Sequence, residues 1–296
     1  NTGFDGGDGS ELNPFVISNA DQLHTVRLYP SSHFVQVADI DLGTAPWNEN
    51  EGWDPIGNDE ELFTGTYDGG GYSVSNLTIN RPDGIRMGLF GNAENAMFSN
   101  IHLENIDIVG LSQLGSIVGH AYTCSIDTCS ASGSINAEGS TIGGIAGFIG
   151  EFSSLTQSYS DVKIIAKYNS VGGLVGVSLN SSIADSYSAG YIGADGYIGG
   201  LVGYCQDQAS VTNCYSVGFV AGVNEVGGLV GSADAPELIV NGFWDIPSSG
   251  QYNSPAGTGL FTNDMLVQSN FTDWDFTTIW SINEGVTYPY LQWQVA

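Results

Sequence analysis

One hexapeptide recurs along the chain at nearly constant spacing. VGGLVG occupies Val171–Gly176 and again Val226–Gly231, and four related hexapeptides share its final glycine and the two apolar residues before it. The six copies end at Gly91, Gly119, Gly147, Gly176, Gly203 and Gly231, in steps of 27 to 29 residues. Each unit contains short β-branched and aromatic segments broken by glycine, without a helical period. Such a repeat predicts an all-β parallel solenoid with coils of about 28 residues.

The columns of the repeat predict two ladders of side chains, because equivalent residues of successive coils stack about 4.8 Å apart. An aromatic column recurs at 28-residue intervals: Tyr159, Tyr187, Tyr215 and Phe243. An amide and hydroxyl column accompanies it: Asn100, Thr128, Gln157, Asp185, Asn213 and Asn241. Stacked side chains of these kinds hold coils in register, so we expect both ladders to be structural.

Glycine is abundant, with 42 residues, and much of it lies in pairs within the hexapeptides. The pairs occupy positions 143–144, 172–173, 199–200 and 227–228. A residue without a Cβ permits a tight bend or a close approach of neighbouring coils. We therefore interpret the pairs as a requirement of the fold rather than as a phosphate-binding loop, and we expect Gly173→Val to destabilise the chain.

The two ends differ from the middle. Residues 1–110 hold 17 acidic side chains, residues 111–231 hold 8 and residues 232–296 hold 7, and all six tryptophans lie outside residues 54–243. Solenoid ends need covering, so we expect one continuous domain with an N-terminal cap and first coils over 1–85, a repeat body over 86–245 and an aromatic C-terminal cap over 246–296. At most two short helices are expected, near Asn19–Tyr29 and Asn263–Gln268.

The charge balance limits the partners. The chain has 32 Asp and Glu but only 5 Lys and Arg, a formal charge of -27. Nucleic acid and anionic membrane surfaces are therefore poor partners, whereas neutral glycans remain compatible. No apolar run is long enough to span a membrane as a helix. The chain begins at Asn1 without a leader sequence, which we interpret as a mature extracellular or cell-surface chain whose signal has been removed.

The sequence resembles proteins that carry the GLUG repeat, named for a Gly-Leu-apolar-Gly core. The core is seen here as GGLVG, and the segments NPFVISNADQL, WDPIG and FTGTYDGGGYSVSNLTI resemble those that precede it. The resemblance implies a right-handed parallel β-helix on a secreted or cell-surface protein. Similar repeats accompany an HExxH zinc site in the metallopeptidases that cleave immunoglobulin A. This chain has four histidines and no HExxH, so that activity is not carried over.

The cysteines are expected to form local disulfides. Cys129 and Cys214 share a column but lie three coils apart, roughly 14 Å at strand spacing. That separation exceeds the ~7 Å Cα limit for a disulfide. We therefore predict the pairs Cys124–Cys129 and Cys205–Cys214, in keeping with a secreted chain.

No cofactor and no catalytic constellation is predicted. The acids of the body fall in scattered columns, without the paired carboxylates that a glycosidase needs. One acid-rich stretch, from Asn48 to Glu61, could bind calcium through several oxygens, and a solvated acidic loop is the alternative. The calcium candidates are Glu49, Glu51, Asp54, Asp59, Glu60 and Glu61.

Two adjacent apolar positions of the hexapeptide raise the question of an interface. Successive side chains of a regular strand point to opposite faces, so one of the two columns would face outward as an apolar stripe. The stripe would consist of Leu89, Ile117, Ile145, Leu174, Leu201 and Leu229. The alternative is that the strand bends at the glycines and both columns point inward.

We expect a non-enzymatic extracellular structural protein that assembles with copies of itself into a surface layer, sheath or adhesive fibre. The nearly uncharged body and the lack of a catalytic constellation favour it. The alternatives are a secreted polysaccharide-active enzyme, either a hydrolase or a lyase, and a glycan-binding module. Fold alone does not choose among these classes.

Overall fold

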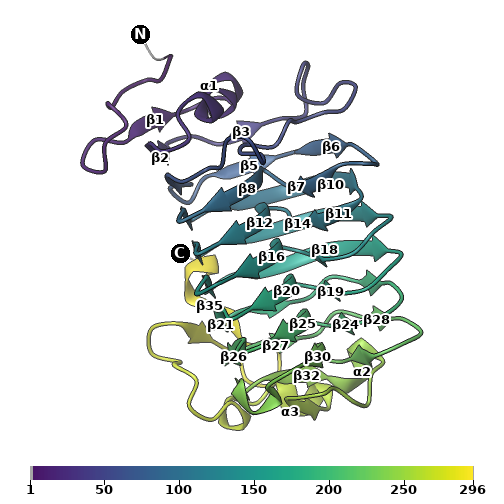
Figure 1. Ribbon diagram of the computed structural model, residues 1–296. Coiled ribbons are helices and arrows are strands. Elements are labelled where there is room, and N and C mark those ends of the chain that lie inside the picture. The colour runs from purple at the N-terminus through teal and green to yellow at the C-terminus, as the bar shows by residue number, and fades with distance from the viewer. Residues whose placement is uncertain (1–2, 296) are drawn as a thin grey trace.

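The computed structural model describes residues 3–295 and shows a parallel β-helix whose coils stack in one column (Figure 1). Four parallel sheets run along the stack, and each coil contributes strands to them in turn. In one coil the chain passes through β12 (Val118–Tyr122), β13 (Ser125–Asp127), β14 (Ser130–Ala137) and β15 (Ile142–Gly143). It then enters β16 (Ala146–Gly150), directly beside β12, and the next coil begins. The expected solenoid is confirmed.

We number the sheets I to IV in the order in which β13, β14, β15 and β16 belong to them. Sheet I contains β1 (Phe15–Ile17), β2 (His33–Gln36), β4 (Thr66–Asp68), β9 (Met97–Ser99), β13, β17 (Ser154–Thr156), β21 (Ser182–Ala184), β26 (Ser210–Thr212) and β31 (Ile239–Val240). Sheet II contains β3 (Ile40–Asp41), β5 (Ser73–Ser75), β6 (Thr78–Asn80), β10 (His102–Gly110), β14, β18 (Tyr159–Ala166), β22 (Tyr187–Ser188), β23 (Ile192–Gly193), β27 (Tyr215–Ser216), β28 (Val220–Ala221), β32 (Phe243–Asp245) and β33 (Thr258–Leu260). Sheet III contains β7 (Ile85–Met87), β11 (Ser112–Leu114), β15, β19 (Val171–Gly172), β24 (Ile198–Gly199) and β29 (Val226–Gly227). Sheet IV contains β8 (Phe90–Glu94), β12, β16, β20 (Val175–Leu179), β25 (Val202–Gln206) and β30 (Val230–Ala233).

The amide and hydroxyl ladder lies at the corner between sheets I and II. All six of its residues have a positive φ, between 44° and 54°. The left-handed conformation turns the chain sharply, and asparagine and aspartate tolerate it better than most residues. The side chains also bridge coils, because Asn241 donates to Asn213 Oδ1 at 3.2 Å and Asn213 donates to Asp185 Oδ1 at 3.3 Å. The amide and hydroxyl ladder is therefore structural, because it turns the chain at the corner and links neighbouring coils.

The hexapeptide places both of its apolar columns in the core. In the copy at Val171–Gly176, β19 ends at Gly172, the corner follows at Gly173 and Leu174, and β20 begins at Val175. The change of direction at the corner turns both apolar side chains inward. The proposed outward stripe is therefore wrong, since its six members are all fully buried: Leu89, Ile117, Ile145, Leu174, Leu201 and Leu229.

Close packing explains the paired glycines. A Cβ built on Gly173 would lie 2.0 Å from Ser188 Oγ and 2.3 Å from the carbonyl oxygen of Gly200. Real Cβ atoms do not approach other atoms so closely, and the second contact is with the backbone of the next coil. The corner therefore requires glycine, as the sequence predicts.

Both ends of the stack are covered. At the N-terminal end Asn19 caps α1 (Ala20–Thr25), because its side chain accepts a hydrogen bond from Gln22 N at 3.0 Å. The 3₁₀ helix Val26–Leu28 extends it, in agreement with the helix expected over Asn19–Tyr29. At the other end the loop after β32 covers sheets III and IV, since Asn253 accepts from Gly228 N and the Ser254 hydroxyl accepts from Val230 N.

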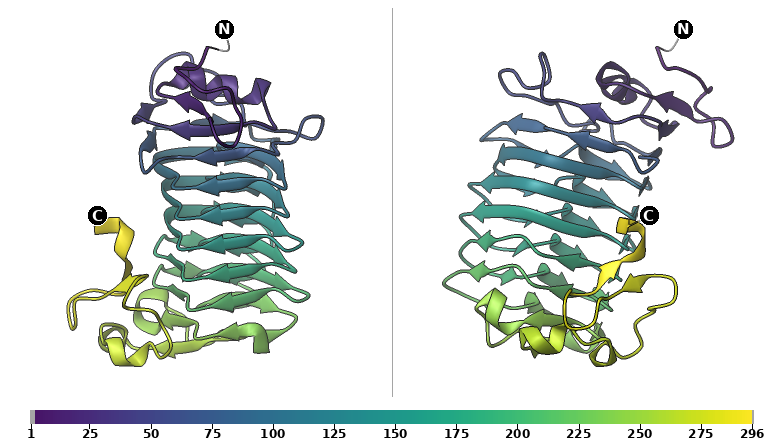
Figure 2. Two further views of the ribbon diagram at one scale, coloured as in Figure 1. Left: turned by 90° about the vertical axis from the view of Figure 1, so that its left-hand side faces the viewer. Right: turned by 180° about the vertical axis from the view of Figure 1, so that it is seen from behind.

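The C-terminal segment, residues 257–295, does more than cover the last coil. It contains β33, α3 (Thr262–Met265) and the antiparallel pair β34 (Trp280–Ser281) and β35 (Tyr290–Leu291), with 3₁₀ turns at Gln268–Asn270 and Gln292–Val295. Figure 2 shows it turning back along the outside of the column toward the N-terminal end. A third short helix, α2 (Ile246–Ser249), precedes it, so the expectation of at most two short helices is wrong. A further 3₁₀ turn lies at Pro236–Leu238.

The aromatic ladder is the surface on which this segment docks. Tyr187 stacks on Tyr159 with ring centroids 5.1 Å apart and on Tyr215 at 4.8 Å. These rings project from the outer face of sheet II and form a second apolar cluster with the C-terminal segment, separate from the main core. Its buried members from the segment are Met265, Phe271, Trp274, Trp280 and Leu291.

Candidate functional site

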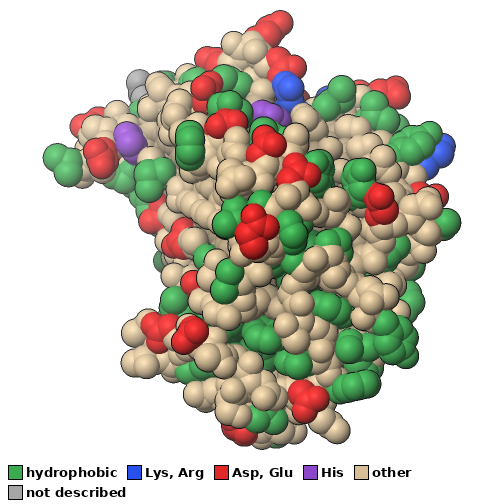
Figure 3. Space-filling view, turned by 60° about the horizontal axis from the view of Figure 1, so that its bottom comes forward, with side chains coloured by type: hydrophobic (Ala, Val, Ile, Leu, Met, Phe, Trp, Pro, Cys, Tyr) green, Lys and Arg blue, Asp and Glu red, His purple; other side chains and the backbone are tan. Residues whose placement is uncertain are grey.

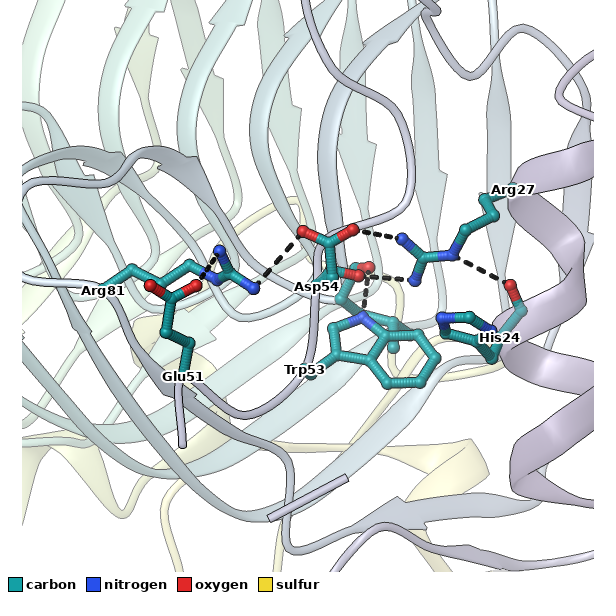
Figure 4. A network of polar contacts seen from close by, with 7 residues as sticks. His24, Arg27, Glu51, Trp53, Asp54 and Arg81 are labelled. Atoms are coloured by element: carbon teal, nitrogen blue, oxygen red, sulfur yellow. Dashed lines mark hydrogen bonds and ion pairs between the residues drawn. The ribbon is translucent and has the colours of Figure 1, made fainter. Parts of the chain in front are cut away.

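The acid-rich stretch holds the N-terminal cap to the coils through arginine. Arg27 contacts Asp54 Oδ2 at 2.7 Å and donates to the Asp54 carbonyl oxygen at 2.6 Å, and its guanidinium lies 5.4 Å from the centre of the Trp53 ring (Figure 4). Arg81 pairs with Glu51 Oε2 at 2.6 Å and approaches Asp54 Oδ1 at 3.5 Å. A pair between Arg86 and Asp59 follows.

These ion pairs engage three of the six calcium candidates. Arginine occupies the carboxylates of Glu51, Asp54 and Asp59, while Glu49, Glu60 and Glu61 are exposed. Within residues 3–295 no three His, Cys, Asp or Glu side chains lie close enough together to hold a metal ion. Three of the five basic residues of the chain are used here, and they offset part of the negative charge of this acidic segment.

The four cysteines are free thiols buried in the core, so the predicted pairs Cys124–Cys129 and Cys205–Cys214 are not formed. Cys124 and Cys129 lie at the opposite ends of β13, where the chain turns into different corners. Cys205 lies in β25 of sheet IV, whereas Cys214 lies beyond β26. Closeness in sequence does not bring these side chains together, because a strand lies between the two cysteines of each pair, β13 in the first and β26 in the second. Burial raises the pKa of all four thiols, to about 11 for Cys124.

Several carboxylates of the repeat body bridge neighbouring coils. Asp127 accepts a hydrogen bond from the Thr156 hydroxyl, and Glu151 accepts from Asn180 at 3.2 Å. Figure 3, with the C-terminal end turned forward, shows the acidic side chains dispersed over the face rather than gathered. Asp127 and Glu151 therefore act as links between coils.

The histidines also pair between coils. His102 Nδ1 lies 2.9 Å from Ser130 Oγ, and His120 Nδ1 lies 3.1 Å from Asn92 Oδ1. Burial lowers the pKa of both imidazoles, to about 4 for His120, where the Arg86 charge contributes. These rings are neutral near pH 7.

The outer face of sheet II carries two depressions that the repeat analysis missed. The first, of about 670 Å³, is open and polar. Its floor follows one column of outward side chains, Thr78, Asp107 and Ser134, which are paired in register from coil to coil. Its side is a chain of hydrogen bonds, in which Asn105 donates to Asn76 at 2.6 Å and Asn76 donates to Asp41 at 2.8 Å.

The second depression, of about 560 Å³, lies between the N-terminal coils and the tip of the C-terminal segment. Asp39, Glu104 and His102 line it from the coils, and Trp293 lines it from the segment. The Trp293 ring stacks on His102 at 4.9 Å and on Tyr159 at 5.6 Å, and its Nε1 donates to the Gln157 carbonyl oxygen at 3.0 Å. Neighbouring residues of β10 line different depressions, Glu104 the second and Asn105 the first.

Comparison with known proteins supports the repeat assignment. A family model described as the GLUG motif matches residues 110–136. The chain carries the GLUG motif. A Gly-rich membrane protein, so named, of Evansella cellulosilytica is 38% identical over 125 residues, which is 40% of this chain and 14% of that protein. Halomucin of Haloquadratum walsbyi is 32% identical over 149 residues, 48% of this chain and 2% of halomucin. The GLUG-motif chain thus corresponds to a small part of either relative.

Two solved structures share the fold. A crystal structure from Bacteroides ovatus that carries the name of an immunoglobulin A1 protease covers 98% of this chain and 95% of that one, with a TM-score of 0.77 and 19% identity. A second structure, named IgA1 Protease, covers 83% of this chain and 21% of that one, with a TM-score of 0.61 and 19% identity. At such identity the likeness is one of fold alone. Across residues 3–295, no helix is long and apolar enough to cross a lipid bilayer.

Proposed function

We propose that this GLUG-motif β-helix is a non-catalytic structural or adhesive module of an extracellular surface protein. The observation that carries the proposal is the use of the polar side chains of the body. Asp127, Glu151 and Asp185 accept hydrogen bonds from the neighbouring coil. His102 and His120 also form hydrogen bonds with side chains of a neighbouring coil. Side chains committed in this way stiffen the stack and are not gathered for chemistry.

The relatives support a surface location for this module. One is named as a membrane protein and the other as halomucin, and the chain matches 14% and 2% of their lengths. A repeat module that forms a small part of a much larger chain suits a spacer or a presenting scaffold. Its charge of -27 keeps such a scaffold soluble and hydrated.

We propose further that copies of this module associate side by side. Covered ends oppose continuation of the sheets from one copy into the next. The apolar stripe of the hexapeptide is buried, so lateral contact requires another surface. Sheet II offers Ile165, Tyr191 and Phe219, which are 38%, 38% and 50% exposed, with the last two rings stacked at 5.8 Å. These three residues form the apolar patch of sheet II.

Analytical ultracentrifugation and negative-stain microscopy over a wide concentration range test the lateral association. The expected result is ordered side-by-side assemblies that Phe219→Ser weakens, while the matched change Phe261→Ser, at another exposed aromatic residue, leaves them unchanged. Monodisperse chains at the highest concentration would contradict self-association. They would leave the scaffold role to be judged by the next experiment.

A polysaccharide-active enzyme is the second candidate, and one observation favours it. Asp39, Asp41, Glu104 and Asp107 all line the depressions of sheet II. Paired carboxylates at a suitable separation can hydrolyse a glycosidic bond. Incubation with neutral polysaccharides and measurement of new reducing ends decides the matter. Turnover that disappears in Glu104→Gln or Asp107→Asn would refute the non-catalytic role.

A further inference from the structure

Lys163, in β18 of sheet II, is an exposed base without a carboxylate partner. The three arginines of the chain pair with acids of the N-terminal cap, and Lys167 pairs with Glu138 at 3.2 Å. Lys163 instead lies with its ammonium group 6.0 Å from the centre of the Tyr191 ring, and it forms no ion pair within residues 3–295. In a chain with a charge of -27, an unpaired base beside exposed aromatic rings marks a surface that attracts an acidic one.

Lys163 belongs to a column of outward side chains that crosses sheet II from coil to coil. The strands β6, β10, β14 and β18, which Figure 1 shows one beside the next, are paired in register, and two stacked rings continue the column. Its members, in order along the stack, are Thr78, Asp107, Ser134, Lys163, Tyr191 and Phe219. Coils are about 4.8 Å apart, so Asp107 and Lys163 lie one step on either side of Ser134. The column is therefore acidic on one side of β14 and basic on the other.

A second column beside the first has the same centre. It contains Val109, Asn136 and Ile165, which are also paired in register. Val109 is half-buried and Ile165 is 38% exposed, and they lie one step on either side of Asn136 in β14. A rotation that exchanges the two sides of β14 therefore places an acid opposite a base in one column and an apolar side chain opposite another in the next.

We propose that two copies of this chain pair through this face of sheet II, about a two-fold axis that runs along β14. The stacks are then antiparallel. Lys163 of each copy meets Asp107 of the other, and Ile165 of each meets Val109 of the other, so every contact is made twice. An axis along the stack would instead place Lys163 opposite Lys163 and Asp107 opposite Asp107, and repulsion opposes that arrangement. The inference rests on the side-by-side association proposed above and names the partner surface and the geometry.

The contact is confined to one half of sheet II. The other half is occupied, because the aromatic ladder carries the C-terminal segment and Glu104 lines the second depression beside Trp293. Asp161, the one acid of β18, lies between Lys163 and Tyr159 on that side. The first column extends roughly 24 Å along the stack. A contact of this size is at the low end of specific interfaces, so we expect the pair to form only at high protein concentration.

Sedimentation velocity with two charge-reversed variants of the full chain tests this geometry. Lys163→Asp and Asp107→Lys should each weaken pairing at least about tenfold, because each places like charges opposite one another twice. An equal mixture of the two variants should restore pairing, because both contacts then join Asp to Lys. High salt should weaken the wild-type pair. Glu237→Lys is the matched control, because it reverses an exposed acid in the turn between sheets IV and I and should leave pairing no weaker.

The mixture keeps the test independent of folding, because a misfolded variant is not restored by adding another. Both reversed residues are exposed, and Asp107 loses only the hydrogen bond from Ser134, so melting temperatures should change little. If the wild type associates but the single reversals have no effect, or their mixture does not recover pairing, this geometry is overturned while side-by-side association through another surface stands. A wild type that stays monomeric at the highest concentration would overturn both.

Discussion

Replacement of Trp280 by alanine tests whether the C-terminal segment is a packing unit of its own. Trp280 is fully buried, with its ring 4.5 Å from that of Trp274 and 5.9 Å from that of Tyr215. Its Nε1 donates to Asp185 Oδ1 at 3.2 Å. Truncation of a buried tryptophan costs about 3–5 kcal/mol. The strand that carries it pairs only with β35, and an isolated two-stranded ribbon is marginal in water, so the docking energy holds the segment in place.

We expect this loss to release the segment and to leave the coils folded. The main core contains none of the buried side chains that the segment contributes to the second cluster. Hydrogen exchange measured by mass spectrometry should show lost protection over residues 271–295 and retained protection over residues 142–206. Leu174→Ala is the control, because Leu174 is buried in the main core and its truncation should lower the melting temperature of all coils together.

Two outcomes would refute this reasoning. Equal loss of protection in the coils and in the segment would mean that both fold as one cooperative unit. Unchanged protection over residues 271–295 would mean that the segment does not depend on the aromatic cluster for its docking.

Three further predictions concern the coils. Gly173→Val should lower the melting temperature strongly, because overpacking costs about 1–3 kcal/mol even where neighbours can shift and here the neighbour is backbone. Gly6→Ala is the mild control, because a Cβ on Gly6 would lie 3.5 Å from Val16. Equal melting temperatures of the two variants would contradict the packing argument. The cysteines should resist iodoacetamide in the native protein, since burial raises their pKa. All four should react after denaturation without a reductant. Fewer than four reactive thiols would support the disulfides that the sequence predicts. The free energy of unfolding should fall as the pH drops from 6.5 to about 4, because the unfolded chain binds a proton at His120 before the folded chain does. His120→Gln should make the melting temperature less dependent on pH over that range. An unchanged pH dependence would exclude this histidine as a cause.

The repeat was predictable because it is a local property of the chain. A fixed spacing of glycines and apolar residues imposes the coil length, and stacking then brings Tyr159 beside Tyr187 without further information. The role of the amide column was also predictable, although its left-handed backbone was not, since the column contains Thr128 and Gln157, which disfavour that conformation. The helix at Asn19 followed from its capping residue.

Two of the errors share one physical cause, which is the direction of a side chain at a corner. Alternation along a regular strand predicts that Leu174 and Val175 point to opposite faces, whereas a corner between β19 and β20 turns both inward. The same limit applies to Cys124 and Cys129, which are close in sequence but occupy different corners. A one-dimensional pattern does not record where the chain changes direction.

The sequence by itself determined the coil, its ladders and the requirement for glycine, because each depends on contacts repeated from one coil to the next. Only the tertiary structure decided what lies outside the coils. The return of the C-terminal segment brings Trp293 beside His102, nearly two hundred positions away in the printed sequence, and no repeat relates the two. The second depression of sheet II exists because this long-range contact places Trp293 against the coils.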